Sequence, residues 1–181
     1  MANLNDSVVD RTERACRLAL DELRESSLTL AVAESLTGGM VCSKYLEIPG
    51  ASTVFKGGVI SYATEVKCNV LGVSQSLLAE YGAVDPQVAL EMANGVREAL
   101  GADVGLATTG VAGPGVAEGK PVGTVYVAVA GNLGWSWKKL NFTGERQEVR
   151  EKTTMAACEL LVTWLDSELL GDAAKKSKLS A

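Results

Sequence analysis

The stretch LTLAVAESLTGG (residues 28–39) decides the fold of this chain. Its apolar first half is short and bounded, which predicts a buried strand. Polar residues and glycines follow at 34–39 and open a helical pattern. Open α/β sheets place ligand sites where a strand ends and a helix begins, and the N–H groups of a helix start attract anions. The stretch therefore predicts a site at a strand end; the alternative is a tight turn with Thr37 as helix N-cap.

Composition limits the function classes. The chain has 181 residues, an apolar share of 47% and a net charge of −5, which suit one globular domain. The negative charge argues against nucleic-acid binding, which needs a basic surface. No window approaches the roughly 20 apolar residues that cross a membrane, and the N-terminus lacks a secretory signal. Four scattered cysteines without a CxxC pair indicate a cytoplasmic protein.

The chain contains no histidine. This absence excludes a Ser-His-Asp or Cys-His mechanism within the chain. The cysteine spacing supports no zinc site either, and we expect neither a metal nor a cofactor. Acid–base chemistry near neutral pH must therefore use lysine, tyrosine, cysteine or a carboxylate.

Hydrophobic periodicity and breaker residues predict alternating strands and helices. Strands are predicted at residues 28–33, 54–62, 104–109, 123–130 and 135–142. Helices are predicted at residues 6–24, 37–46, 64–71, 74–81, 86–100 and 145–167. This order predicts an α/β fold with a mixed sheet of about five strands between helical layers, the last two strands antiparallel. Residues 1–170 are expected to form a single domain, and 171–181 a polar, disordered tail.

Three segments place polar side chains at the end of an apolar strand. They are AESLTGG at 33–39, SYATEVK at 61–67, and TTG at 108–110 with the glycine-rich loop that follows. Without histidine, a serine nucleophile needs a lysine base, whose ordinary pKa of about 10.4 must fall by roughly 3 units to act at neutral pH. Lys67 is the candidate base for Ser35, with Tyr62 relaying a proton or orienting the hydroxyl. The alternative is a solvated surface lysine beside an ordinary tyrosine.

The glycine-rich loop and the last predicted helix hold candidate anion-binding groups. Backbone N–H groups between Thr109 and Gly115 can face a phosphate or an oxyanion, unless the glycines only let the chain turn. Arg146 is another candidate, or else an ordinary surface arginine. Trp135 and Trp137 alternate along one strand face. They either close the core or are buried at the interface of a homodimer, the oligomer we expect.

The motifs taken together resemble those of the CinA C-terminal domain family. They are AESLTGG (33–39), FKGGVISYATEVK (55–67), LGV (71–73), YGAV (81–84), TGVAGPG (109–115), KPVGTVY (120–126) and FTGER (142–146). The resemblance covers about residues 22–165 in the family's order. The family includes stand-alone nicotinamide-nucleotide amidohydrolases of the PncC type. It implies a three-layer α/β/α fold and hydrolysis of the carboxamide of nicotinamide mononucleotide to nicotinate mononucleotide and ammonia, without a metal.

The resemblance also implies roles for particular residues. Ser35 would be the nucleophile, with Tyr62 and Lys67 as its catalytic partners. The expected substrate-binding residues are Glu34, Thr37, Gly38, Gly39, Thr109, Gly110, Ala112, Gly113 and Arg146. Among them, backbone N–H groups at 37–39 or 109–113 would bind the oxyanion, and the glycine loop with Arg146 would hold the ribose phosphate.

The sequence departs from the motif pattern of the family at two places, and two other functions stay open. Where the family often has serine after YGAV, this chain has Asp85, which would weaken phosphate binding if it faced the phosphate. The loop after Gly115 is also short. The open alternatives are a non-catalytic or regulatory nucleotide-binding domain with the same fold, and an amidase for another small amide. All three functions predict a small-molecule ligand.

Overall fold

The computed structural model describes residues 7–179, with side chains through residue 168. Within this part the chain forms six α-helices, one short 3-10 helix and five strands. They are α1 (Val8–Glu25), β1 (Leu30–Glu34), α2 (Met40–Leu46), η1 (Ala51–Thr53), β2 (Phe55–Ile60), α3 (Thr64–Leu71), α4 (Gln75–Tyr81), α5 (Pro86–Ala99), β3 (Val104–Gly110), β4 (Thr124–Gly131), β5 (Gly134–Asn141) and α6 (Arg146–Leu179).

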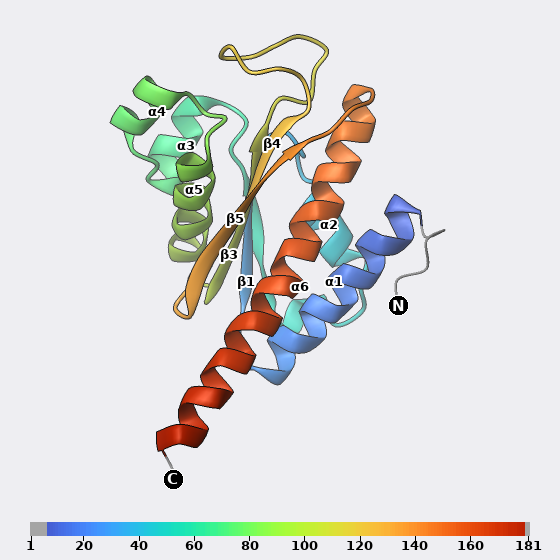
Figure 1. Cartoon of the computed structure of the whole chain (residues 1–181), viewed down its shortest axis with the longest axis vertical. Helices are drawn as coiled ribbons and strands as arrows, with labels where there is room; N and C mark the ends of the chain where they lie inside the picture. Colours follow the sequence, from blue (N-terminus) through green and yellow to red (C-terminus); the bar gives the residue numbers. More distant parts are fainter. Residues whose placement is uncertain (1–6, 180–181) are drawn as a thin grey trace.

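The strands form one mixed sheet in the order β2-β1-β3-β4-β5. β1 pairs in parallel with β2 and β3, whereas β4 pairs antiparallel with β3 and β5. Helices α1, α2 and α6 cover one face of the sheet, and α3, α4 and α5 cover the other (Figure 1). The predicted three-layer α/β/α fold with a mixed five-stranded sheet is thus confirmed.

The central strand β1 is buried along its whole length. Leu30 and Val32 pack into the layer formed by α1, α2 and α6, while Ala31 and Ala33 pack into the layer of α3 and α5. A parallel strand covered on both faces reads as a continuous apolar run rather than as an alternating one. Burial on both faces therefore explains why the sequence that forms β1 is continuously apolar.

Parallel pairing brings the predicted polar segments together. Glu34 at the end of β1 pairs with Ile60 of β2 on one side and with Thr108 of β3 on the other. The carboxyl ends of these three strands therefore meet at one edge of the sheet. In Figure 1 this is the upper edge, where the loop between β3 and β4 arches outward and α6 begins.

The start of α2 differs from the prediction. The helix begins at Met40 rather than at Thr37, and Gly39 occupies the N-cap with a left-handed φ of 96°. The Thr37 hydroxyl hydrogen-bonds the hydroxyl of Thr108 (2.7 Å) instead of capping the helix. The cap is supplied by the carboxylate of Glu34, which accepts three backbone hydrogen bonds at the helix start. A negative charge at a helix N-terminus is favourable because of the helix dipole.

Helix α6 is longer than predicted. It continues to Leu179 and so includes residues 171–179, for which a disordered tail was expected; residues 180–181 lie outside the described part. After Gly171 the sequence is rich in alanine and lysine and has no proline, and such residues extend an existing helix at little cost. No helix in the described part combines the length and hydrophobicity that crossing a membrane requires.

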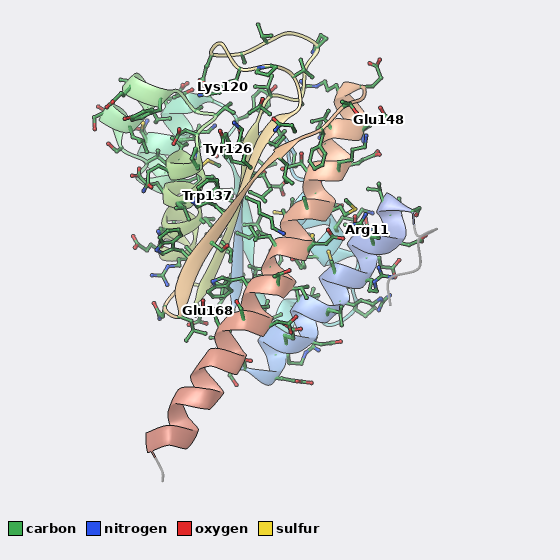
Figure 2. The ribbon with its side chains drawn as sticks, viewed as in Figure 1. Arg11, Lys120, Tyr126, Trp137, Glu148 and Glu168 are labelled. Atoms are coloured by element: carbon green, nitrogen blue, oxygen red, sulfur yellow. The ribbon has the colours of Figure 1, made fainter. Side chains whose placement is uncertain are left out.

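The two tryptophans of the edge strand β5 do not close the core. Trp135 is 64% exposed and Trp137 is 40% exposed. Trp137 meets the ring of Tyr126 on β4 edge-on, at 6.3 Å between centroids (Figure 2). Of the two interpretations of these residues, burial in the monomer core is therefore wrong, and a homodimer stays a prediction that light scattering can test.

Candidate functional site

A cavity of about 260 Å³ opens at the carboxyl ends of the parallel strands. Its walls come from the segments after β1, β2 and β3, from the residues before α5 and from the start of α6; among the lining residues are Ser35, Leu36, Tyr62, Lys67, Val84, Gly110, Gly113, Glu118 and Arg146. Small-molecule pockets usually measure about 300–1,000 Å³. At about 260 Å³ the cavity lies just below this range, a size that suits a small ligand.

Ser35 and Lys67 are in direct contact at this cavity. The Nζ of Lys67 donates a hydrogen bond to the Oγ of Ser35 (3.1 Å) and another to the carbonyl oxygen of Ser61 (2.5 Å). The backbone N–H of Ser35 extends the β1–β3 pairing by donating to the carbonyl of Thr108 (3.1 Å). The strand end thus fixes the serine, and α3 brings the lysine to it.

The surroundings of Lys67 favour its neutral form. Its side chain is only 1% exposed, and this burial lowers the pKa of Lys67 below its ordinary value of 10.5. Electrostatic interactions with Glu118 and Cys68 oppose this change and raise the pKa of Lys67, but they do not cancel the effect of burial. A neutral amine that contacts a serine hydroxyl can accept the proton of that hydroxyl.

Tyr62 and Arg146 meet at the mouth of the cavity. Tyr62 is 65% exposed, and its hydroxyl accepts a hydrogen bond from Nη2 of Arg146 (3.2 Å). Nη1 of Arg146 donates to the carbonyl oxygen of Gly113 (2.6 Å). In the described part of the chain, the tyrosine hydroxyl is linked to this arginine and not to Ser35 or Lys67. The structure therefore places Tyr62 beside the expected phosphate-binding group, away from the serine–lysine contact.

Glu34 does not reach the cavity. Its side chain is fully buried, and its carboxylate accepts hydrogen bonds from the N–H groups of Gly39 (2.8 Å), Val41 (3.2 Å) and Cys42 (2.8 Å). A buried carboxylate must be satisfied in this way because burial without partners is costly. The turn at residues 37–39 lies outside the cavity lining as well. None of these four residues lines the cavity; Glu34 supports the turn behind Ser35, and contact of the four with a substrate stays a prediction.

Because the turn at residues 37–39 lies outside the cavity lining, the backbone N–H groups of β3 and the loop after it become the candidates to face an oxyanion. N–H and C=O groups of alternate residues in a strand point to the same side. In β3, the carbonyl of Thr108 receives the N–H of Ser35, so the N–H of Gly110 faces the same side as Ser35. The N–H of Val111 is already donated to Thr124 (2.9 Å). Gly110 lines the cavity, so its N–H is a candidate oxyanion donor on the Ser35 side.

The other predicted residues of the glycine-rich loop also line the cavity, namely Thr109, Ala112 and Gly113. The hydroxyl of Thr109 donates to the carbonyl of Ala83 (2.7 Å) and so connects β3 to the segment before α5. Asp85, by contrast, lies outside the lining. Its carboxylate caps α5 by accepting from a backbone N–H two residues further on (2.8 Å).

Two charged side chains in the second half of the loop between β3 and β4, Glu118 and Lys120, were not predicted as site residues. Glu118 lines the cavity and accepts hydrogen bonds from the N–H groups of Ala83 (2.9 Å) and Val84 (3.1 Å). Lys120, labelled in Figure 2, donates to the carbonyl of Tyr81 (2.6 Å). These contacts fix one wall of the cavity.

Arg150 on α6 was also missed. Its guanidinium donates to the carbonyl oxygens of Leu36 (3.0 Å) and Thr37 (2.8 Å), in the turn that follows Ser35. The only signal in the sequence is its spacing of one helical turn from Arg146, which places both arginines on the same face of α6.

The fold and the site define an α/β protein with a serine–lysine pair in a small-molecule cavity at the strand ends. A model of the CinA C-terminal domain matches residues 13–165. The chain therefore belongs to the CinA C-terminal domain family, as its motifs indicated.

Named relatives agree with this assignment. The chain is 48% identical to the CinA-like protein of Frankia casuarinae over 144 residues, which are 80% of this chain and 33% of that protein. It is 44% identical to the CinA-like protein of Geobacter sulfurreducens over 169 residues, 92% of this chain and 40% of that protein. The chain thus spans about a third of the length of the curated relatives it matches first.

Solved structures show the same fold. The competence/damage inducible protein CihA from Agrobacterium tumefaciens has a TM-score of 0.82 at 32% identity, over 91% of this chain and 99% of that one. A competence-damaged protein (CinA) superfamily member from Klebsiella pneumoniae has a TM-score of 0.83 at 29% identity, over 86% of this chain and 98% of that one.

Proposed function

We propose that this chain hydrolyses the carboxamide of nicotinamide mononucleotide to nicotinate mononucleotide and ammonia, with Ser35 as nucleophile and Lys67 as general base. The hydrogen bond from the buried amine of Lys67 to the Ser35 hydroxyl (3.1 Å) carries the proposal. In a chain without histidine, this pair supplies both the nucleophile and the base. Membership of the CinA family supports the choice of reaction, and the motif resemblance supports the choice of substrate.

The reaction proceeds in two halves. Ser35 Oγ attacks the carboxamide carbon while neutral Lys67 takes the hydroxyl proton, and a tetrahedral oxyanion forms. The protonated lysine gives its proton to the amide nitrogen. Ammonia then departs, and the acyl group stays bound to Ser35 as an ester. Neutral Lys67 then takes a proton from a water molecule that attacks the ester carbon, and it returns this proton to Ser35 Oγ as the ester bond breaks and nicotinate mononucleotide leaves. The N–H of Gly110 is the proposed oxyanion donor, and one such donor is typically worth about 3 kcal/mol.

The phosphate is assigned to the mouth of the cavity. Arg146 is anchored there by Gly113 and Tyr62, which fixes the guanidinium before a ligand arrives. A pre-oriented guanidinium matches phosphate geometry and loses little freedom on binding. In this account Tyr62 assists by orienting Arg146.

Ammonia release from nicotinamide mononucleotide tests the proposal. With a metal chelator present, the wild type should release ammonia, and folded Ser35→Ala should do so at least about 10³-fold more slowly, because the nucleophile is gone. Ser136→Ala is the matched control, since it removes a serine hydroxyl from the edge strand β5, away from the cavity; its rate should equal that of the wild type.

Two results would contradict the proposal in different ways. If neither protein releases ammonia but a nucleotide raises the melting temperature, the chain is a binding domain. If another small amide is hydrolysed and nicotinamide mononucleotide is not, the chemistry stands and the substrate is wrong.

A further inference from the structure

Arg150 contacts the turn after Ser35 from outside the cavity. Nε donates to the carbonyl of Leu36 (3.0 Å), Nη2 to the carbonyl of Thr37 (2.8 Å), and Nη1 to the side-chain oxygen of Gln147 (2.9 Å). One rigid guanidinium therefore holds two consecutive carbonyls in a single orientation, and Gln147 holds the guanidinium.

The turn has room for this contact because it contains glycine. Gly38 adopts a left-handed φ of 58°, and a Cβ there would lie 3.3 Å from Nη2 of Arg150. A side chain at this position would be strained by the backbone conformation and would crowd the guanidinium. The glycine that the sequence suggested for substrate contact thus serves the approach of Arg150.

Ser35 lies between two anchors. On the sheet side its N–H donates to Thr108 (3.1 Å), and on the helix side the carbonyl of the next residue, Leu36, is held by Arg150 (3.0 Å). Because peptide units are planar, holding both ends leaves few backbone rotations by which Ser35 can turn away from Lys67.

We propose that Arg150 is a positioning residue that keeps the Ser35 hydroxyl within reach of Lys67, an inference that rests on the proposed role of Ser35 as nucleophile. Arg150 does not line the cavity, so its loss should slow the chemical step and leave substrate affinity nearly unchanged. A displacement of about 1 Å at a reacting group can cost roughly 10²-fold in rate.

The test uses an alkyl fluorophosphonate, which is attacked by an activated serine and loses fluoride, so that the reaction does not require the natural substrate. Arg150→Met should be labelled on Ser35 about 10²-fold more slowly than the wild type. Arg150→Lys should fall between the two, because an ammonium retains donors but not the fork. With nicotinamide mononucleotide, Arg150→Met should lower kcat by a similar factor while KM changes less than about threefold.

Lys152→Met is the matched control. Lys152 also lies on α6 and donates to a backbone carbonyl, that of Thr143 (2.7 Å), but not to the turn after Ser35. Its labelling rate should stay within about twofold of the wild type, because its hydrogen bond contributes to stability without contacting the turn after Ser35.

If Arg150→Met, shown to be folded by circular dichroism, is labelled at the same rate as the wild type, the proposal is overturned. If Arg150→Met does not fold, Arg150→Lys decides by the same comparison, and a wild-type rate again overturns it. A wild type that is labelled on Ser35 but does not hydrolyse nicotinamide mononucleotide refutes the proposed substrate alone, because the comparison of labelling rates still tests Arg150.

Discussion

Lys67→Met is expected to abolish amide hydrolysis in a protein that still folds. Methionine fills similar space without an amine, so Ser35 loses the group that accepts its proton (3.1 Å). General-base catalysis is worth roughly 10²–10⁴-fold in rate, and the loss should be at least that large. Ammonia release, with circular dichroism as the check on folding, measures the effect.

The same variant should change how stability depends on pH. Burial lowers the pKa of Lys67 in the folded protein below its ordinary 10.5, so the unfolded chain binds more protons below that pH. Above about pH 10.5 Lys67 is neutral in both the folded and the unfolded state, so its titration does not affect the free energy of unfolding. As the pH falls, the lowered pKa of Lys67 reduces the free energy of unfolding by a growing amount, which levels off below the folded-state pKa. Urea unfolding at several pH values should show the stability difference moving in favour of Lys67→Met as the pH falls.

Lys44→Met is the control for both measurements. Lys44 lies on α2 and pairs with the exposed Glu47 (2.8 Å), outside the cavity. It should keep wild-type activity and the wild-type dependence of stability on pH. Near-normal activity in folded Lys67→Met would rule out lysine as the base.

Glu34→Ala should cause the largest loss of stability of any change at the site. The substitution leaves three backbone N–H groups at the start of α2 without their carboxylate. Each hydrogen bond to a charged group contributes about 1.5–3 kcal/mol, and entering water replaces part of that. We expect the free energy of unfolding to fall by about 3 kcal/mol or more, with activity reduced because the turn after Ser35 loses its support.

Urea denaturation measures this loss against Glu47→Ala. Glu47 is an exposed carboxylate of the same segment, paired with Lys44, and an exposed pair contributes at most about 1 kcal/mol. Glu34→Gln should lie between the two, because an amide oxygen accepts some of the three hydrogen bonds. A Glu34→Ala protein as stable as Glu47→Ala would show that the buried carboxylate is not what holds the turn.

The residues at the strand ends show how far sequence reasoning reaches. A hydroxyl after a buried strand and the absence of histidine were enough to single out Ser35 and Lys67, because strand ends meet in a parallel sheet and few side chains can act as bases. Glu34 was predicted to bind substrate, whereas its carboxylate lies at the start of α2, and the sequence held a signal for that position. Side chains alternate along a strand, so Glu34 shares the face of Leu30 and Val32, which lies under α2.

Arg150 could not have been identified in the same way. Several arginines and lysines begin the last helix, and which of them reaches the turn after Ser35 depends on how α6 packs across the sheet. The orientation of Tyr62 is likewise a tertiary property, because its partner Arg146 is 84 residues away in sequence. Local patterns predict elements and strand ends, whereas contacts between distant elements require the fold.

Rapid acid quenching during turnover tests most directly whether Ser35 is the nucleophile. Wild-type protein quenched with nicotinamide mononucleotide should carry an ester on the peptide that contains Ser35, with the mass of the substrate less ammonia. Ser35→Ala should carry none and release no ammonia. Ammonia release at the wild-type rate by folded Ser35→Ala, with no ester on Ser35 of the wild type, would contradict the account.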